Sequence, residues 1–237
     1  MLTPIDSEAL QSICDQVAVA LNQKLQEELA VEKADDAVLY ANIIARVVND
    51  GQLIIRAAGG SPGSAYELLQ HSTGELVRAL NESSVLHDIP MKDAASFAAT
   101  CVKELANALH KKVNIKATGG DQLSLSPLFK FAIYEVLKNS VGHSVTSTVD
   151  IDIRVTKERT GAWKLEISDN GPGIPDEYKS EAFRPHKDHM KNPSGMGLYL
   201  VKKIANKYGG RVWVEDRVHG DHKKGASVVI TIPLDKL

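Results

Sequence analysis

The sequence predicts an α+β protein in two parts, a helical hairpin followed by an α/β sandwich in which one sheet packs on a layer of helices. Two observations carry this prediction. Apolar side chains recur every three or four positions from Ser7 to about Arg56, with no proline in that stretch. Strand-like alternation begins only after Leu86, where alternating segments are interspersed with helical ones, as in a sheet covered by helices.

The first segment, residues 1–33, is predicted to be an amphipathic helix. Glu, Gln and Lys separate its apolar positions, which fall on one helical face. These positions are Leu10, Ile13, Val17, Leu21 and Leu25.

Residues 34–85 are predicted to form a helical hairpin. A second apolar stripe runs from Leu39 to about Ile55, and Gly59–Gly63 combines a helix stop with a turn. Apolar positions from Tyr66 to Leu80 then indicate a returning helix. Because so small a hairpin cannot bury both apolar faces, we expect a homodimer in which two hairpins form a four-helix bundle.

Residues 86–237 are predicted to be the sandwich domain. Ser126-Pro127 is typical of a helix start, with a capping residue before proline at the first helical position, and this helix is expected to reach His143. The other expected elements are helices at about 94–110 and 194–208 and strands at 113–117, 149–155, 163–168, 211–215 and 227–233.

Composition excludes several classes of function. The formal net charge of −2 gives no global field for nucleic acid or an acidic membrane. No basic-then-apolar leader and no apolar run of roughly 20 residues is present, which predicts no membrane insertion and a cytoplasmic location. Cys14 and Cys101 lie in apolar helical patterns without metal-ligand spacing and are interpreted as buried thiols in a reducing compartment.

Chemistry-bearing residues begin on the helix that ends at His143. Glu135 and Asn139 are four residues apart and share a face that His143 continues. A carboxylate and an amide oxygen there suit base catalysis and Mg²⁺ coordination. A solvated amphipathic helix explains these residues equally well when they are taken alone.

Two glycine-rich segments follow. A strand ends at Ser168 and runs into Asp169-Asn170-Gly171-Pro172-Gly173-Ile174-Pro175, where a carboxylate at a strand end can accept hydrogen bonds from an adenine amino group. Gly195-Met196-Gly197-Leu198 immediately precedes a helix, so backbone N–H groups and the helix dipole face a phosphate. Each signal is weak by itself.

Between these segments, residues 175–194 lack strong periodicity and contain Phe183 among basic residues. The basic residues are Lys179, Arg184, Lys187 and Lys191. A basic segment beside a phosphate site is interpreted as a lid, with a solvated loop as the alternative.

Taken in order, these elements resemble the GHKL ATPase superfamily, and within it the histidine kinases. Glu135 and Asn139 look like the N box, Asp169–Gly173 the G1 box, Phe183 the F box and Gly195–Gly197 the G2 box. The resemblance covers residues 86–237 and implies a Bergerat-type ATP-binding domain. The segments 197–203 and 208–217 are similar to histidine kinases of methanogens and other archaea.

The resemblance also implies individual roles. Asp169 would hold adenine, Asn139 the Mg²⁺, and the Gly195–Leu198 backbone the phosphates, with Glu135 as candidate base. The further residues expected to contact the nucleotide are His143, Asn170, Gly171, Gly173, Ile174 and Phe183. Such a site acts by positioning and by neutralising charge on the transferred phosphoryl group.

The sequence departs from the histidine-kinase pattern at three positions, one of which is Val47, where an acidic neighbour of the acceptor normally stands. Gly142 stands where a Lys or Arg usually reaches phosphate, and Arg46 stands at the position of the phosphoacceptor histidine in the segment 39–50. Arginine stays protonated and cannot accept phosphate as a nucleophile. His71, on the returning helix, is the nearest substitute, although a surface histidine is the simpler interpretation.

Two functions therefore compete. One is a dimeric ATP-binding regulator that transfers phosphate slowly or not at all, and the other is an active kinase that phosphorylates a partner, such as a response regulator, or an atypical histidine. A mismatch-repair or chaperone ATPase is less expected, since no transducer domain follows the last strand. An anti-sigma serine kinase would not be expected to need the hairpin.

Overall fold

The computed structural model describes residues 19, 31–57, 67, 69–71, 73–75, 77, 88–185 and 196–233. The chain divides into two compact units, 1–87 and 88–237. Several sequence predictions lie outside the described residues: most of the helix 1–33, the turn 59–63, much of the returning helix, Gly195, and the lid residues Lys187 and Lys191.

The first unit contains helix α2, Val31–Ala57. Its buried residues include Leu39, Ile43, Ile44 and Val47 of the predicted apolar stripe. Arg46 is half-buried on the same helix. The described residues between 67 and 77 are helical, and three of them at a spacing of four are buried on one face, namely Leu69, Thr73 and Val77. Pairing with a second copy stays a prediction.

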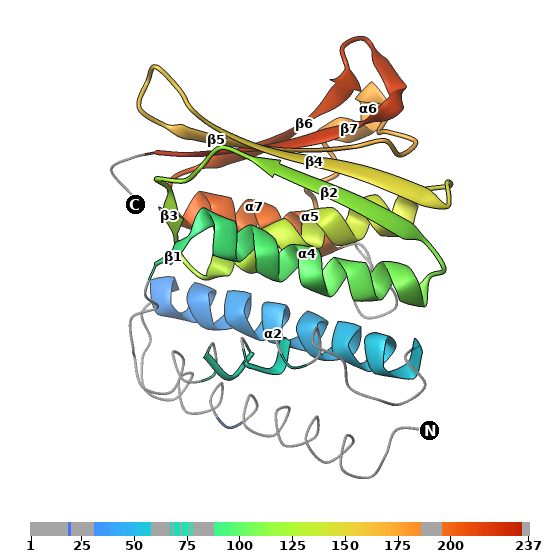
Figure 1. The fold of residues 1–237 in the computed structure, drawn as a ribbon. Coiled ribbons are helices and arrows are strands. Elements are labelled where there is room, and N and C mark those ends of the chain that lie inside the picture. The colour runs from blue at the N-terminus through green and yellow to red at the C-terminus, as the bar shows by residue number, and fades with distance from the viewer. Residues whose placement is uncertain are drawn as a thin grey trace. The chain divides into compact units, whose positions relative to one another are not determined.

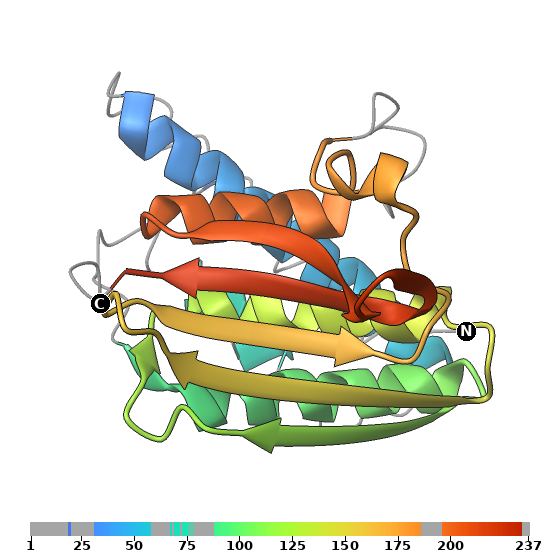
Figure 2. The same cartoon turned by 90° about the horizontal axis from the view of Figure 1, so that it is seen from above.

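The second unit is built on a five-stranded sheet of order β2-β4-β5-β7-β6 (Figure 2). Its strands are β2 (Lys112–Thr118), β4 (Thr148–Lys157), β5 (Trp163–Asp169), β6 (Arg211–Val218) and β7 (Asp221–Ile232). Strands β2 and β4 are parallel, and every other neighbouring pair is antiparallel. The sheet is therefore mixed.

Helices α4 (Met91–Ala108), α5 (Leu128–His143) and α7 (Gly197–Lys207) cover one face of this sheet, as Figure 1 shows. Helix α5 packs against both α4 and α7. In β4 the residues that face the helices alternate with more exposed ones; the buried set is Val149, Ile151, Ile153 and Val155. The predicted α+β sandwich is confirmed for this unit.

Small elements were not predicted because they are too short to show periodicity. Strands β1 (Ile89–Pro90) and β3 (Ser124–Leu125) form a separate two-stranded sheet. Helix α6 (Asp176–Lys179) is a single turn. Among the helices that the structure describes, none has the length and hydropathy needed to cross a bilayer.

Two predicted boundaries differ from the structure for identifiable reasons. Helix α5 begins at Leu128, and the Ser126 hydroxyl accepts only a 3.4 Å hydrogen bond from the Leu128 N–H. That hydroxyl is also an acceptor for the Tyr208 hydroxyl at 2.5 Å. Strand β7 begins at Asp221 rather than 227, because its Lys- and Gly-rich start pairs with β6 across a hairpin that propensity alone does not reveal.

Candidate functional site

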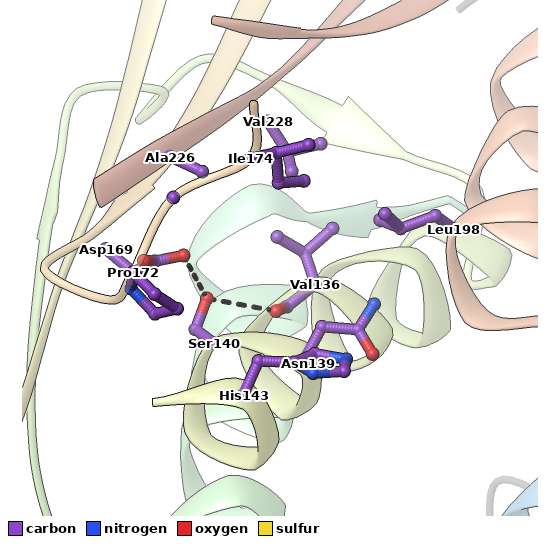
Figure 3. A pocket seen from close by; sticks show the side chains of 11 residues that line it. Val136, Asn139, Ser140, His143, Asp169, Pro172, Ile174, Leu198, Ala226 and Val228 are labelled. Carbon is purple, nitrogen blue, oxygen red and sulfur yellow. Dashed lines mark hydrogen bonds between the residues drawn. The ribbon is translucent and has the colours of Figure 1, made fainter. Parts of the chain in front are cut away.

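A cavity of about 320 Å³ lies where α5, the loop after β5, the start of α7 and strand β7 meet. This volume is at the lower end of the range for small-molecule sites. The cavity is lined by Val136, Asn139, Ser140, His143, Asp169, Pro172, Gly173, Ile174, Leu198, Ala226 and Val228. Figure 3 shows Asp169 and Pro172 on one side and Leu198 on the other.

Helix α5 contributes Val136, Asn139, Ser140 and His143 to this lining. Their spacings of three and four residues place them on one helical face. The prediction placed Glu135 on this face together with Asn139 and His143. The structure instead centres the face on Val136 and Ser140.

Glu135 is buried beside the cavity without lining it. Its Oε1 accepts a hydrogen bond of 2.9 Å from the Lys138 ammonium, one turn along α5. The two side chains are 6% and 15% exposed, so this ion pair is largely shielded from water. Glu135 is therefore held in an ion pair with Lys138 beside the cavity and does not face it.

Asp169 is the last residue of β5, where pairing with Ile151 of β4 fixes its backbone. Its Oδ1 accepts a 2.8 Å hydrogen bond from the Gly171 N–H, and its Oδ2 accepts one of 2.9 Å from the Ser140 hydroxyl. An ionised carboxylate has about four acceptor positions. Each oxygen thus keeps one position for a ligand donor in the cavity.

The loop after β5 is held against β7 by close backbone contacts. Gly173 has φ +69°, and a Cβ there would lie 1.6 Å from the His222 carbonyl oxygen. Gly225 of β7 has φ +114°, and its Cβ would lie 1.9 Å from the Asp169 carbonyl oxygen. Only glycine fits either position. The cavity wall that carries Asp169 is consequently fixed by backbone packing.

The start of α7 forms the opposite side. Met196 precedes the helix, Gly197 is its first residue, and Leu198 lines the cavity. The N–H groups of a first helical turn have no partner within the helix. They are suitable donors for an anion, as the sequence predicts. Gly195, the other glycine of this motif, lies outside the described residues.

Five predicted contact residues that the structure describes do not line the cavity, namely Asn170, Gly171, Phe183, Met196 and Gly197. The Asn170 side chain turns to β4, where it accepts a 2.9 Å hydrogen bond from the Asp150 N–H and donates one of 3.2 Å to the Asp150 carboxylate. Gly171 acts through its N–H on Asp169, and Phe183 is buried in the interior. Local motif patterns locate a loop but do not tell which side chains turn inward.

The described start of the predicted lid is tied to the sheet. Lys179 of α6 bonds the carboxylates of Asp176 and Asp216, both at 2.5 Å. Hydrogen bonding to Lys179 holds the pKa of Asp176 below its ordinary value. The hydrogen bonds to Asp176 and Asp216 raise the pKa of Lys179. Arg184 is paired with Glu181 at 2.9 Å, so these two cations already have carboxylate partners.

Five lining residues were not predicted from the sequence. Val136, Ser140 and Pro172 stand beside predicted residues, and the helical period would have found the first two. Ala226 and Val228 have no local signal. They reach the cavity because β7 pairs with β5, with Val228 opposite Ile167.

The described residues contain no group of three or more His, Cys, Asp and Glu side chains that could hold a metal ion. Asn139 offers one amide oxygen in the cavity. Mg²⁺ commonly keeps several waters and is completed by substrate phosphates. The residues present therefore fit a metal that arrives with a polyphosphate and do not form a separate metal site.

Comparison with known proteins identifies the C-terminal domain. Residues 124–236 match the family described as histidine kinase-, DNA gyrase B-, and HSP90-like ATPase. The adaptive-response sensory kinase SasA of Synechocystis is 28% identical over 166 residues, which are 65% of this chain and 41% of SasA. The histidine-protein kinase/phosphatase MprB of Mycobacterium avium is 27% identical over 176 residues, 70% of this chain and 33% of MprB.

The chain thus spans less than half the length of these two curated relatives. Both are bacterial, so they give no support to the predicted archaeal resemblance. Among solved structures, a mycobacterial MprB kinase structure has a TM-score of 0.50 at 21% identity, covering 62% of this chain and 97% of that one. The histidine kinase domain of Erythrobacter litoralis EL346 has a TM-score of 0.54 at 14% identity, covering 95% and 97%. These similarities show the fold.

Residues 124–236 thus match an ATPase family that includes histidine kinases, and ATP is the ligand that such a domain implies.

Proposed function

We propose that this protein is a dimeric, ATP- and Mg²⁺-binding signalling protein derived from a histidine kinase, and that it acts as a regulatory pseudokinase in the cytoplasm. One observation carries the nucleotide part: Asp169, held by two hydrogen bonds, faces a cavity that also contains Asn139 and the first turn of α7. The pseudokinase part of the proposal rests on the prediction that Arg46 stands at the phosphoacceptor position, because arginine cannot accept phosphate.

Different residues of the cavity are proposed to contact different parts of the nucleotide. Asp169 accepts a hydrogen bond from the adenine amino group, and the apolar side chains of Val136, Ile174 and Val228 pack on the ring. His143, the last residue of α5, is a further proposed nucleotide contact. Asn139 would supply a protein oxygen to Mg²⁺, whose charge would offset that of the phosphates.

The proposed output is a change in the arrangement of helices on ATP binding. A ligand shifts a conformational equilibrium by its difference in affinity for the two states. The partner that reads this change is proposed to be a response regulator or another signalling protein, and the homodimer forms through the N-terminal helices. Both statements rest on the sequence predictions.

Calorimetric titration with ATP, with and without Mg²⁺, tests the nucleotide site. We expect saturable binding in the micromolar range that Mg²⁺ tightens, and phosphate release close to the buffer rate. Absence of heat at several hundred micromolar ATP would contradict the proposal at its base. Measurement of mass by light scattering tests the homodimer separately.

An active kinase is the second candidate, because one observation favours it. The described His71 has a side chain 71% exposed, and its Nδ1 lies 4.0 Å from the Glu75 carboxylate. At 4.0 Å the Glu75 carboxylate does not hydrogen-bond the imidazole, whose exposed ring nitrogens are accessible to a phosphoryl donor. His71 is the one histidine among the described residues of the first unit, and its exposure makes it the candidate acceptor.

Incubation with γ-labelled ATP separates the two functions. The pseudokinase predicts no acid-labile label on wild type, His71→Ala or Glu135→Ala. Label that is present on wild type, retained by the exposed-histidine control His219→Ala and lost from His71→Ala and Glu135→Ala establishes the kinase instead.

A further inference from the structure

Ser140 is a buried hydroxyl on the cavity face of α5. The residue is 6% exposed, and its Oγ lies 2.9 Å from Asp169 Oδ2 and 3.2 Å from the Val136 carbonyl oxygen (Figure 3). A hydroxyl has one proton, so it donates to one of these acceptors at a time. The shorter contact, to a charged acceptor, is the stronger of the two.

The contact to Asp169 completes the support of that carboxylate. Gly171 N–H holds Oδ1 from the loop, and Ser140 holds Oδ2 from α5. Two donors on different oxygens fix the rotation of a carboxylate plane, which a single donor leaves free. The remaining acceptor positions are thereby aimed before a ligand arrives, which lowers the entropy cost of binding.

We infer that Ser140 is a positioning residue that determines specificity for a 6-aminopurine. This inference rests on the proposed nucleotide function and deepens it. The hydroxyl acts only through Asp169, so its contribution to affinity depends on the amino group that Asp169 accepts from. A nucleotide without that group gains nothing from the alignment.

The test compares two ligands and two proteins. ATP and purine riboside triphosphate, which lacks the 6-amino group, are titrated with Mg²⁺ into wild type and Ser140→Ala. Loss of one hydrogen bond to a charged group corresponds to about a tenfold change in Kd. We expect Ser140→Ala to weaken ATP about 5- to 20-fold and the deaminated nucleotide less than about twofold.

Two further variants separate positioning from packing. Ser140→Thr keeps the hydroxyl and is expected to restore most of the preference for ATP. Ser140→Cys keeps the volume with a weak donor, and it replaces Ser140→Ala if the alanine variant unfolds. Ser144→Ala is the matched control, since Ser144 is equally buried at 6% but bonds Thr146 outside the cavity.

The outcomes distinguish this inference from the proposed function. Wild type that binds ATP, with equal weakening of both nucleotides in Ser140→Ala, overturns the role of Ser140 alone. Wild type that binds neither nucleotide overturns the proposed function and this inference with it. A loss confined to ATP and reversed by Ser140→Thr establishes the positioning role.

Discussion

The loop after β5 and the last turn of α5 each contain a glycine, Gly173 and Gly142, and the surroundings of the two glycines differ. A Cβ at Gly173 would lie 1.6 Å from a backbone oxygen, whereas a Cβ at Gly142 would meet nothing within 4 Å. The first glycine is required by a crossing of two backbones. The second leaves open space where related kinases were expected to have a cation. Residue type alone does not reveal this difference; the surroundings do.

Substitution of Gly173 provides the largest expected effect. Gly173→Ala combines a positive φ with a collision against backbone, and it should lower the free energy of unfolding by about 3 kcal/mol or more in urea titrations. Gly220→Ala is the control, because Gly220 has φ +74° with nothing within 4 Å. It should cost about 1 kcal/mol. Equal losses in the two variants would show that the backbone crossing contributes nothing.

Asp169→Asn tests whether the carboxylate on the cavity wall after β5 binds the nucleotide. The amide removes the negative charge and replaces one acceptor oxygen with an N–H₂ donor, which cannot accept a hydrogen bond from an adenine amino group. ATP affinity should fall about 100-fold, near 3 kcal/mol. Asp150→Asn is the comparison, since Asp150 bonds Asn114 and Asn170 outside the cavity. It should bind ATP within about twofold of wild type, and equal losses in calorimetry would exclude a specific role for Asp169.

Substitutions of Gly142, in the last turn of α5, are expected to increase stability or ATP affinity. Gly142→Ala should raise the free energy of unfolding by about 0.5–1 kcal/mol, since glycine weakens helices and the site has room. ATP binding should not change. Gly142→Lys should bind ATP several-fold more tightly than Gly142→Ala, while adenosine binds the two equally. A lysine that tightens both ligands alike would show that it does not reach the phosphates.

Removal of the Lys179 ion pairs with Asp176 and Asp216 has the smallest expected effect. Lys179→Gln should speed amide hydrogen exchange at Tyr178 and Ala182, which bond within and after α6. Lys224→Gln removes an exposed pair with Asp221 and serves as control. The exchange difference between Lys179→Gln and wild type measures the contribution of the ion pairs at each pH.

That contribution has a defined pH window. The Asp176 pKa is lowered, so its part is present above the ordinary carboxyl pKa and is lost as the pH falls through the lowered value. The Lys179 pKa is raised, so its part is present below the ordinary lysine pKa and is lost as the pH rises through the raised value. An exchange difference that stays constant into strong acid would contradict the Asp176 contact.

Particular residues show which features of the site can be predicted from the sequence. Asn139 and His143 were placed on one face because four residues make about one helical turn, and Asp169 was placed at a strand end by alternation that stops at a glycine loop. All three line the cavity. Asn170 and Phe183 belong to the same motifs but turn elsewhere, because pairing with β4 and burial in the interior decide their side-chain directions.

The sequence by itself determined the α+β class of the second unit, the order of its helices and main strands, and the segments from which the cavity is made. Local periodicity and turn chemistry act over a few residues, so they are visible in the chain. The tertiary structure alone decided that Ser140 bonds Asp169 across 29 positions and that Gly225 crosses behind Asp169. Val228 likewise reaches the cavity only through β7. Such contacts depend on which strands pair and which backbones meet, and no short stretch of sequence contains that information.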